Sequence, residues 1–183
     1  SCDDDISLHA SNGTTQKRFT VNGAVALDAA KAEVAEALLS TCNGSLVWTQ
    51  GKYVPQVGVA VPNSRKHTLT ADNLRGGIKF TTRASKSQRM NAVRGVFVDA
   101  ANTYQATDFA HVKNTTYATE DGEELFGDIQ LALTTDNVEA QRLAKQVLEA
   151  NRQAIEVDFP ANMTCFHMQP NDIVELSIDP DGA

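Results

Sequence analysis

The clearest pattern of apolar positions lies in residues 136–152. Asp136 and Glu139 have the spacing of a helix capping box, although Thr135 could serve as the cap instead. Apolar side chains then recur three and four residues apart, at Val138, Ala140, Leu143, Ala144, Val147 and Leu148. The opposite face carries the charged side chains Glu139, Arg142, Lys145 and Glu149. The pattern predicts a helix that packs Val138, Leu143 and Val147 on a β-barrel and leaves Glu139 and Arg142 for solvent or a neighbouring subunit.

The first 61 residues carry a second set of patterns. Residues 18–21 alternate polar and apolar and run into the turn dipeptide Asn22-Gly23, which predicts a strand with a short continuation at 24–27. Asp28 suits a helix N-cap, and Val34, Leu38 and Cys42 follow at four-residue spacing. We therefore expect a helix from 28 to 42, stopped by Asn43-Gly44. Residues 45–49 and 52–54, joined by Gln50-Gly51, predict a hairpin.

The rest of the chain favours short strands. Residues 61–67 lack periodicity and concentrate Pro, Asn, Ser and charge, as a linker does. Strands are expected at 78–83, 92–98, 103–107, 109–113, 129–133, 155–159 and 173–178. Together these elements predict an α+β fold with two domains. Residues 1–61 form a small strand-helix-hairpin domain that is incomplete without neighbours, and residues 62–183 form an antiparallel β-barrel-like domain that carries the helix 136–152.

Composition and charge narrow the class of protein. The 183 residues have a mean hydropathy of −0.30 and a net charge of −7, from 16 basic and 23 acidic side chains. An acidic balance of this size argues against a protein whose main work is to bind phosphate backbones. No run reaches the roughly 18 apolar residues of a membrane-spanning helix. The chain begins with Ser1-Cys2 rather than Met, and we expect it to be an interior piece of a longer polypeptide.

Candidate chemistry is sparse. The histidines His9, His67, His111 and His167 are far apart, and Cys2, Cys42 and Cys165 have no metal or redox spacing. Acidic side chains cluster at Asp121, Glu123, Glu124 and Asp128, and we interpret them as a solvated turn rather than the carboxylate pair of a glycosidase. The basic cluster Arg83, Lys86, Arg89 and Arg94 lacks interleaved aromatic residues. We therefore assign no catalytic, cofactor-binding or metal-binding residue and expect no cofactor.

Three segments resemble one family of proteins. They are the run 88–97 around Asn91-Ala92-Val93-Arg94, the Asp121-Gly122 turn, and the helical run Ala140-Gln141-Arg142-Leu143-Ala144. In this order they resemble the tail proteins of long-tailed bacteriophages, and in particular the hub region of the lambda-type host-specificity, or tip attachment, protein. That family continues with a Gly-Asp-Val-Val type turn, for which this chain has Asn171-Asp172-Ile173-Val174. Asn tolerates the left-handed conformation better than other non-Gly residues, so the departure is mild.

The resemblance implies a non-enzymatic structural component of a phage or prophage tail tip. It implies a virion protein, made in the bacterial cytoplasm, that links the tail tube to receptor-binding parts during host attachment and DNA delivery. Its expected partners are other tail-tip proteins and copies of itself, in a trimeric ring of the full-length protein. DNA would pass through that channel without specific binding, past acidic side chains, and this fragment would not insert into a membrane. The alternative is a carbohydrate-binding or carbohydrate-cleaving tail-tip module that uses Asp121 and aromatic residues such as Trp48 or Tyr104.

Overall fold

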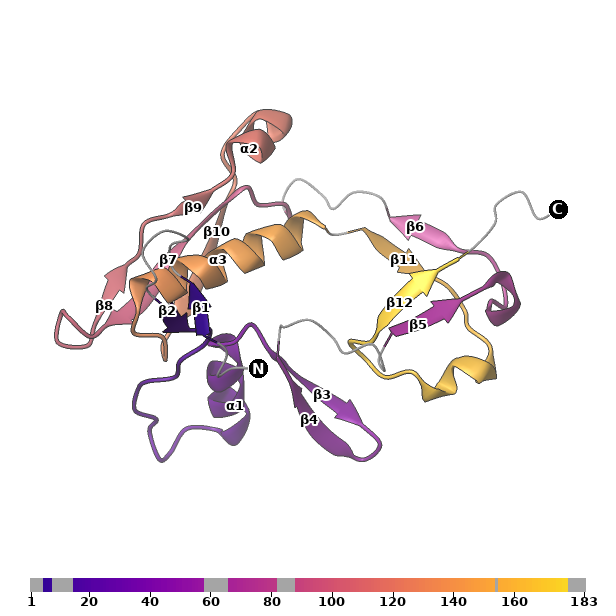
Figure 1. The fold of residues 1–183 in the computed structure, drawn as a ribbon, viewed down its shortest axis with the longest axis horizontal. Coiled ribbons are helices and arrows are strands. Elements are labelled where there is room, and N and C mark those ends of the chain that lie inside the picture. Colours follow the sequence, from indigo (N-terminus) through magenta and orange to yellow (C-terminus); the bar gives the residue numbers. More distant parts are fainter. Residues whose placement is uncertain (1–4, 8–14, 58–65, 82–87, 154, 178–183) are drawn as a thin grey trace. The chain divides into compact units, whose positions relative to one another are not determined.

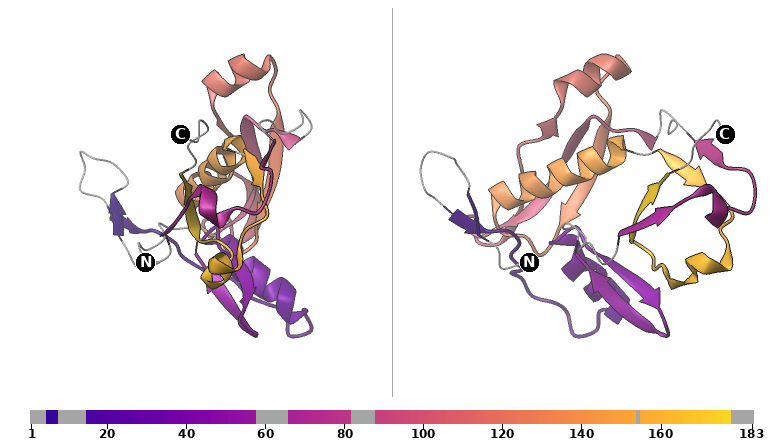
Figure 2. Two further views of the ribbon diagram at one scale, coloured as in Figure 1. Left: turned by 90° about the vertical axis from the view of Figure 1, so that its right-hand side faces the viewer. Right: turned by 45° about the vertical axis from the view of Figure 1, so that its right-hand side comes forward.

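The computed structural model describes residues 5–7, 15–57, 66–81, 88–153 and 155–177. It mixes helices and short strands, as expected for an α+β fold. The chain divides into two compact units (Figures 1 and 2). The first unit comprises Ser1–Leu46, Pro55–Gly58 and Ser85–Gln153, and the second comprises Val47–Val54, Val59–Ala84 and Ala154–Ala183. The boundary expected at residues 61 and 62 lies outside the described residues and stays a prediction.

A four-stranded sheet forms the centre of the first unit (Figure 1). Its long strand β7 (Ala92–Asp99) pairs antiparallel with β8 (Gln105–Asp108) and β9 (Val112–Lys113), and parallel with β10 (Phe126–Leu131). The prediction of an antiparallel sheet is therefore wrong for β10. Lys113 at the end of β9 and Phe126 at the start of β10 both lie opposite Ala92, on the two sides of β7. The connection between them crosses the start of β7, and β10 must then run in the same direction as β7.

Helix α3 (Asn137–Arg152) forms as predicted and packs against this sheet (Figure 1). Its N-cap is Asp136, whose side chain accepts a hydrogen bond from the Glu139 amide at 2.8 Å, so Thr135 is not the cap. The buried apolar side chains of the helix are Ala140, Leu143, Ala144 and Leu148. The predicted packing face of Val138, Leu143 and Val147 is partly wrong, because Val138 is 49% exposed. The expectation for Glu139 is also wrong, because this side chain is completely buried.

The N-terminal elements differ from the predicted ones. Strands β1 (Asp5–Ser7) and β2 (Thr15–Lys17) pair antiparallel, and the strand expected at 18–21 does not form. Residues 18–22 instead form hydrogen bonds to α3 and to the chain after β10, which explains why they do not continue β2. Helix α1 (Lys31–Ser40) begins three residues later than the predicted N-cap Asp28. It also ends two residues before the predicted Cys42. The stop at Asn43-Gly44 is confirmed, since Asn43 is left-handed at φ 48° and the Gly44 amide donates to the Leu39 carbonyl at 2.9 Å.

The predicted hairpin is confirmed. Strands β3 (Ser45–Thr49) and β4 (Lys52–Gln56) pair with each other, and the two residues between them have positive φ, 49° at Gln50 and 80° at Gly51. Two consecutive positive φ values are typical of the tight turns whose twist matches that of a hairpin.

The second unit is built from short strand pairs. Strand β5 (Lys66–Leu69) pairs parallel with β12 (Ile173–Leu176), and β6 (Lys79–Thr81) pairs antiparallel with β11 (Glu156–Asp158). Two short 3-10 helices, η2 (Ala71–Asn73) and η4 (Met163–His167), connect them. Lys66 and His67 were expected in a linker, and they belong to β5. Among the strands that the structure describes, no set closes into a barrel, so the barrel-like detail is not confirmed.

Several strand predictions hold with shifted bounds. The predicted runs at 109–113, 155–159 and 173–178 contain β9, β11 and β12. Those at 92–98, 103–107 and 129–133 overlap β7, β8 and β10. Helix α2 (Thr115–Asp121) was not predicted. Its cap is Asn114, whose side chain accepts from the Thr116 amide at 3.0 Å. Asn171 takes a left-handed φ of 65°, as expected for the residue that replaces Gly in the turn before β12.

The contact between β7 and β10 depends on a glycine. A Cβ atom at Gly95 would lie 2.0 Å from the Ile129 carbonyl oxygen, which belongs to the backbone and cannot turn away. We expect Gly95→Ala to lower the free energy of unfolding by about 3 kcal/mol, because the two strands would have to separate. The matched control is Gly77→Ala, since a Cβ there meets nothing within 4 Å and should change stability by less than about 0.5 kcal/mol. Urea denaturation measures both, and equal effects would contradict this account.

Candidate functional site

The motif residues of the run 88–97 and the Asp121-Gly122 turn come together at one end of α3. The Asn91 side chain is completely buried and donates to Asp121 Oδ2 at 3.1 Å and to the Glu123 carbonyl at 2.8 Å. Its own oxygen accepts from the Leu125 amide at 2.8 Å. One side chain therefore joins the start of β7 to the segment between α2 and β10.

Two arginines converge on the same carboxylate. Arg152, at the end of α3, donates to both oxygens of Asp121 at 3.0 and 2.8 Å, and Arg89 donates to Oδ1 at 3.2 Å. The side chain of Asp121 is only 2% exposed. Hydrogen bonds from Arg152, with help from Asn91 and the charge of Arg89, hold the pKa of Asp121 below its usual range despite the opposing effect of burial.

A lowered pKa argues against the carbohydrate-cleaving interpretation. A glycosidase acid must hold a proton near neutral pH, which requires a raised pKa. The pKa of Asp128 is lowered as well, chiefly by its hydrogen bond from Arg94. The turn at 120–124 is in part the last turn of α2, capped by the left-handed Gly122 at φ 77°. Its residues Glu120 and Glu124 form ion pairs with Arg152 and Lys113.

The basic cluster does not form a free cationic patch from its described members. Arg89 pairs with Asp121, and Arg94 lies 2.6 Å from Asp128. The other two expected members, Arg83 and Lys86, lie outside the described residues. These pairings agree with the interpretation that the cluster is not a nucleic-acid site.

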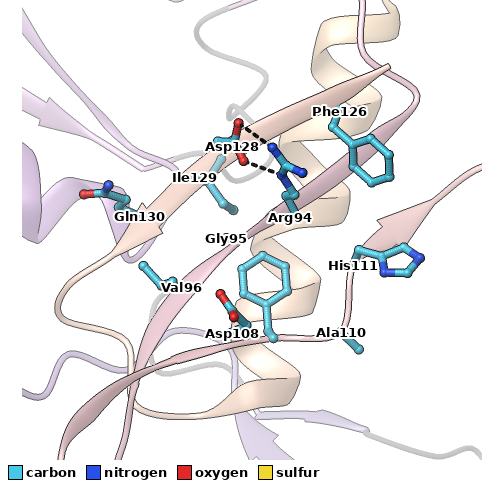
Figure 3. Close-up of a pocket in the computed structure, with 11 residues that line it drawn as sticks. Arg94, Gly95, Val96, Asp108, Ala110, His111, Phe126, Asp128, Ile129 and Gln130 are labelled. Carbon is cyan, nitrogen blue, oxygen red and sulfur yellow. Dashed lines mark hydrogen bonds and ion pairs between the residues drawn. The ribbon is translucent and has the colours of Figure 1, made fainter. Parts of the chain in front are cut away.

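The sheet face of the first unit that lies away from α3 holds a hollow of about 720 Å³ (Figure 3). The Arg94–Asp128 pair lies in it, and the guanidinium of Arg94 lies 5.3 Å from the centre of the Phe126 ring. His111 meets the same ring edge to face at 6.1 Å between ring centres. Charged and aromatic side chains from β7 and β10 thus meet on an open face that can receive another protein surface.

Two histidines that the sequence separates by 100 positions meet in the second unit. His67 and His167 contact each other edge to face at 5.0 Å between ring centres, and His67 Nε2 lies 3.2 Å from Asp172 Oδ2. Within the ranges that the structure describes, no group of three His, Cys, Asp or Glu side chains has the geometry of a metal site. His9 and Cys2 lie outside the described residues, while Cys42 and Cys165 are buried. None of the described helices combines the length and hydropathy of a transmembrane span.

Comparison with known proteins decides the family. The model of a family described as "Putative phage tail protein" matches residues 31–183. The chain belongs to this family of phage tail proteins. A chain of a solved structure, "Virion of native gene transfer agent (GTA) particle", shares its fold with a TM-score of 0.61 at 21% sequence identity. The match covers 81% of this chain and 33% of that chain. No curated protein sequence matches.

The second unit of this tail protein exposes more large apolar side chains than it buries. In its described part, the buried hydrophobic side chains are Val47, Leu69 and Cys165. Exposed large apolar side chains are Trp48, Tyr53, Phe80, Ile155, Met163, Phe166, Ile173 and Val174. Phe166 and Met163, both on η4, are 86% and 79% exposed. Exposed apolar side chains in this number are typical of a surface that another protein covers.

Proposed function

We propose that this tail protein is a structural component of the tail tip, of the hub type that its sequence resembles. It would link the tail tube to receptor-binding parts during host attachment and DNA delivery. Its partners would be other tail-tip proteins and further copies of itself, arranged as a trimeric ring in the full-length protein. Membership of a phage tail family supports a virion component rather than an enzyme.

The observation that carries the proposal is the excess of exposed over buried apolar side chains in the second unit. Strand β5 pairs parallel with β12. Parallel strands occur in proteins almost only where other elements cover both faces of their sheet. We infer that the strand pairs of this unit are parts of a barrel-like domain that is completed by neighbouring protein in the assembled tail. A component with an incomplete core of this kind is suited to permanent assembly.

A second candidate function, glycan binding at the tail tip, rests on the hairpin. Trp48 and Tyr53 are 57% and 66% exposed and meet at 4.6 Å between ring centres, at an angle of 63°. Aromatic rings in solvent can stack on sugars. Carbohydrate binding, unlike carbohydrate cleavage, needs no catalytic carboxylate. Tyr104, the other aromatic residue considered from the sequence, is also 57% exposed.

Deleting the gene from the phage or prophage genome and examining the particles by electron microscopy tests the proposal. A tail-tip component predicts particles whose tails are absent or lack the tip, with assembly restored by the wild-type gene. The Trp48→Ala variant separates the two candidates. If it assembles normal tails that no longer adsorb to cells, glycan binding gains support, and if the deletion itself leaves complete tails, the structural proposal fails.

A further inference from the structure

Residues 18–23, here called the arm, lie along α3 and the chain that follows β10. The Thr20 amide donates to Glu139 Oε1 at 2.7 Å, and the Thr20 hydroxyl donates to Glu139 Oε2 at 2.5 Å. The guanidinium of Arg142 donates to the Arg18 carbonyl. The Asn22 amide donates to the Leu133 carbonyl at 3.0 Å. The arm is thus held through its backbone and one hydroxyl, as an extended peptide is held in a binding site.

The receptor for the arm is centred on a buried carboxylate. Glu139 is 0% exposed, and among the described residues it forms no salt bridge. A buried carboxylate is costly unless hydrogen-bond donors reach its oxygens, and the arm supplies a donor to each of them. Phe19, the residue before Thr20, is 7% exposed. The site therefore favours a residue that, like Thr20, offers both a backbone amide and a hydroxyl donor.

The arm is joined to α1 by a segment with little attachment of its own. Residues 24–28 are exposed, and Leu27 is fully so. The described backbone hydrogen bond of this segment, from the Ala29 amide to the Ala26 carbonyl, stays within it. The seven residues 24–30 can span roughly 24 Å when extended. The family match begins at residue 31, so it contains the receptor on α3 and excludes the arm.

We propose that the Glu139 site is an exchangeable docking site, and that in an assembly it receives the arm of a second copy of this chain. The contacts are the same whether the arm comes from its own chain or from a neighbour, so the exchange loses no interaction and depends on local concentration. Domain swapping exchanges an identical element between subunits in this way and at low cost. The proposal relies on the proposed function only for the presence of neighbouring copies, and it can be tested on the isolated chain.

The test uses the full chain in two isotopic forms. One copy carries a photo-crosslinking benzoylphenylalanine in place of Phe19, the other is wild type and labelled with nitrogen-15, and the two are refolded together at high concentration. After illumination, mass spectrometry should find the arm of the unlabelled (light) copy joined to α3 peptides of the nitrogen-15 labelled (heavy) copy. The yield of this product should rise with protein concentration. Glu139→Gln in the heavy copy should reduce this yield about tenfold, since it weakens the hydrogen bonds to Thr20. The same photo-crosslinker at Leu27 is the control and should give no product with α3.

Cross-links confined to light α3 peptides would overturn the proposal. A second measurement covers the case in which the photo-crosslinking variant does not fold. Deleting residues 24–27 shortens the linker, and the shortened chain should form dimers in sedimentation experiments, which Thr20→Val should weaken. A shortened chain that stays monomeric at all concentrations would also overturn it. Neither result depends on tail assembly, so failure here leaves the proposed function untouched.

Discussion

Asn91→Asp should lower the free energy of unfolding of the first unit by roughly 3 kcal/mol near neutral pH. The substitution keeps the shape of the side chain and therefore creates no cavity. It replaces the Nδ2 group, which lies 3.1 Å from Asp121 Oδ2 and 2.8 Å from the Glu123 carbonyl, with an oxygen. Two donated hydrogen bonds then become contacts between acceptors, at a position that is 0% exposed.

The stability that Asn91→Asp removes should become smaller as the pH falls. In the wild-type protein the pKa of Asp121 lies below its usual range, chiefly because of Arg152, so its contribution is present above about pH 4 and is lost as the pH falls through the lowered folded-state pKa. In the variant two carboxylates face each other, which raises the pKa of the pair. Protonation of one carboxylate restores a hydrogen-bond donor between the two. The difference in free energy of unfolding between the wild-type protein and the variant should therefore narrow as the pH falls through the raised pKa.

Urea denaturation at about pH 7 and about pH 5 measures both effects. Asn102→Asp is the matched control, because Asn102 is exposed and its side chain donates a long hydrogen bond of 3.4 Å to Thr107. It should change stability by less than about 0.5 kcal/mol. A variant Asn91→Asp as stable as this control, or one whose deficit widens on acidification, would show that Asn91 does not hold the motif together.

Replacing Met163 with Gln and Phe166 with Ser should abolish incorporation into tails and leave the isolated chain intact. The two side chains are 79% and 86% exposed, so in the isolated chain their removal forfeits few contacts. In an assembled tail the same side chains would be covered by neighbouring protein. Burying two large apolar side chains contributes about 3 to 6 kcal/mol, enough to change association by two or more orders of magnitude.

The measurement is the amount of the double variant in purified particles relative to the wild-type chain. Val138→Ser is the matched control, because Val138 is also exposed, at 49%, but lies on α3 of the first unit. It should be incorporated normally. If the double variant enters particles as efficiently as Val138→Ser, the exposed surface of η4 is not an assembly surface. If the double variant is unfolded in solution, η4 instead belongs to the core.

Elements fixed by local interactions could be predicted from the sequence. The cap at Asp136, the stop at Asn43-Gly44 and the turn at Gln50-Gly51 involve residues close together in the chain. Their hydrogen bonds follow from residue type and spacing alone. The family resemblance likewise rested on short runs, and the family match over residues 31–183 supports its phage-tail part.

Features that depend on distant partners could not be predicted in this way. Glu139 looks solvent-facing on a helical wheel, and only its contact with Thr20, 119 positions earlier, explains its burial. Asp121 looked like part of a solvated turn, yet Arg152 and Asn91 reach it from 31 and 30 positions away. The parallel pairing of β5 with β12 has no local signal, because a parallel pair leaves no tight turn in the sequence.

The central claim is that this chain is a structural part of the tail tip. The most direct test is a cryo-electron microscopy reconstruction of purified particles from cells that express the tail genes. The account predicts that the fold of the first unit, with α3 on the β7–β10 sheet, fits density at the end of the tail, and that Phe166 and Met163 are covered by neighbouring protein. Particles with a complete tail tip in which no density fits this fold would contradict it.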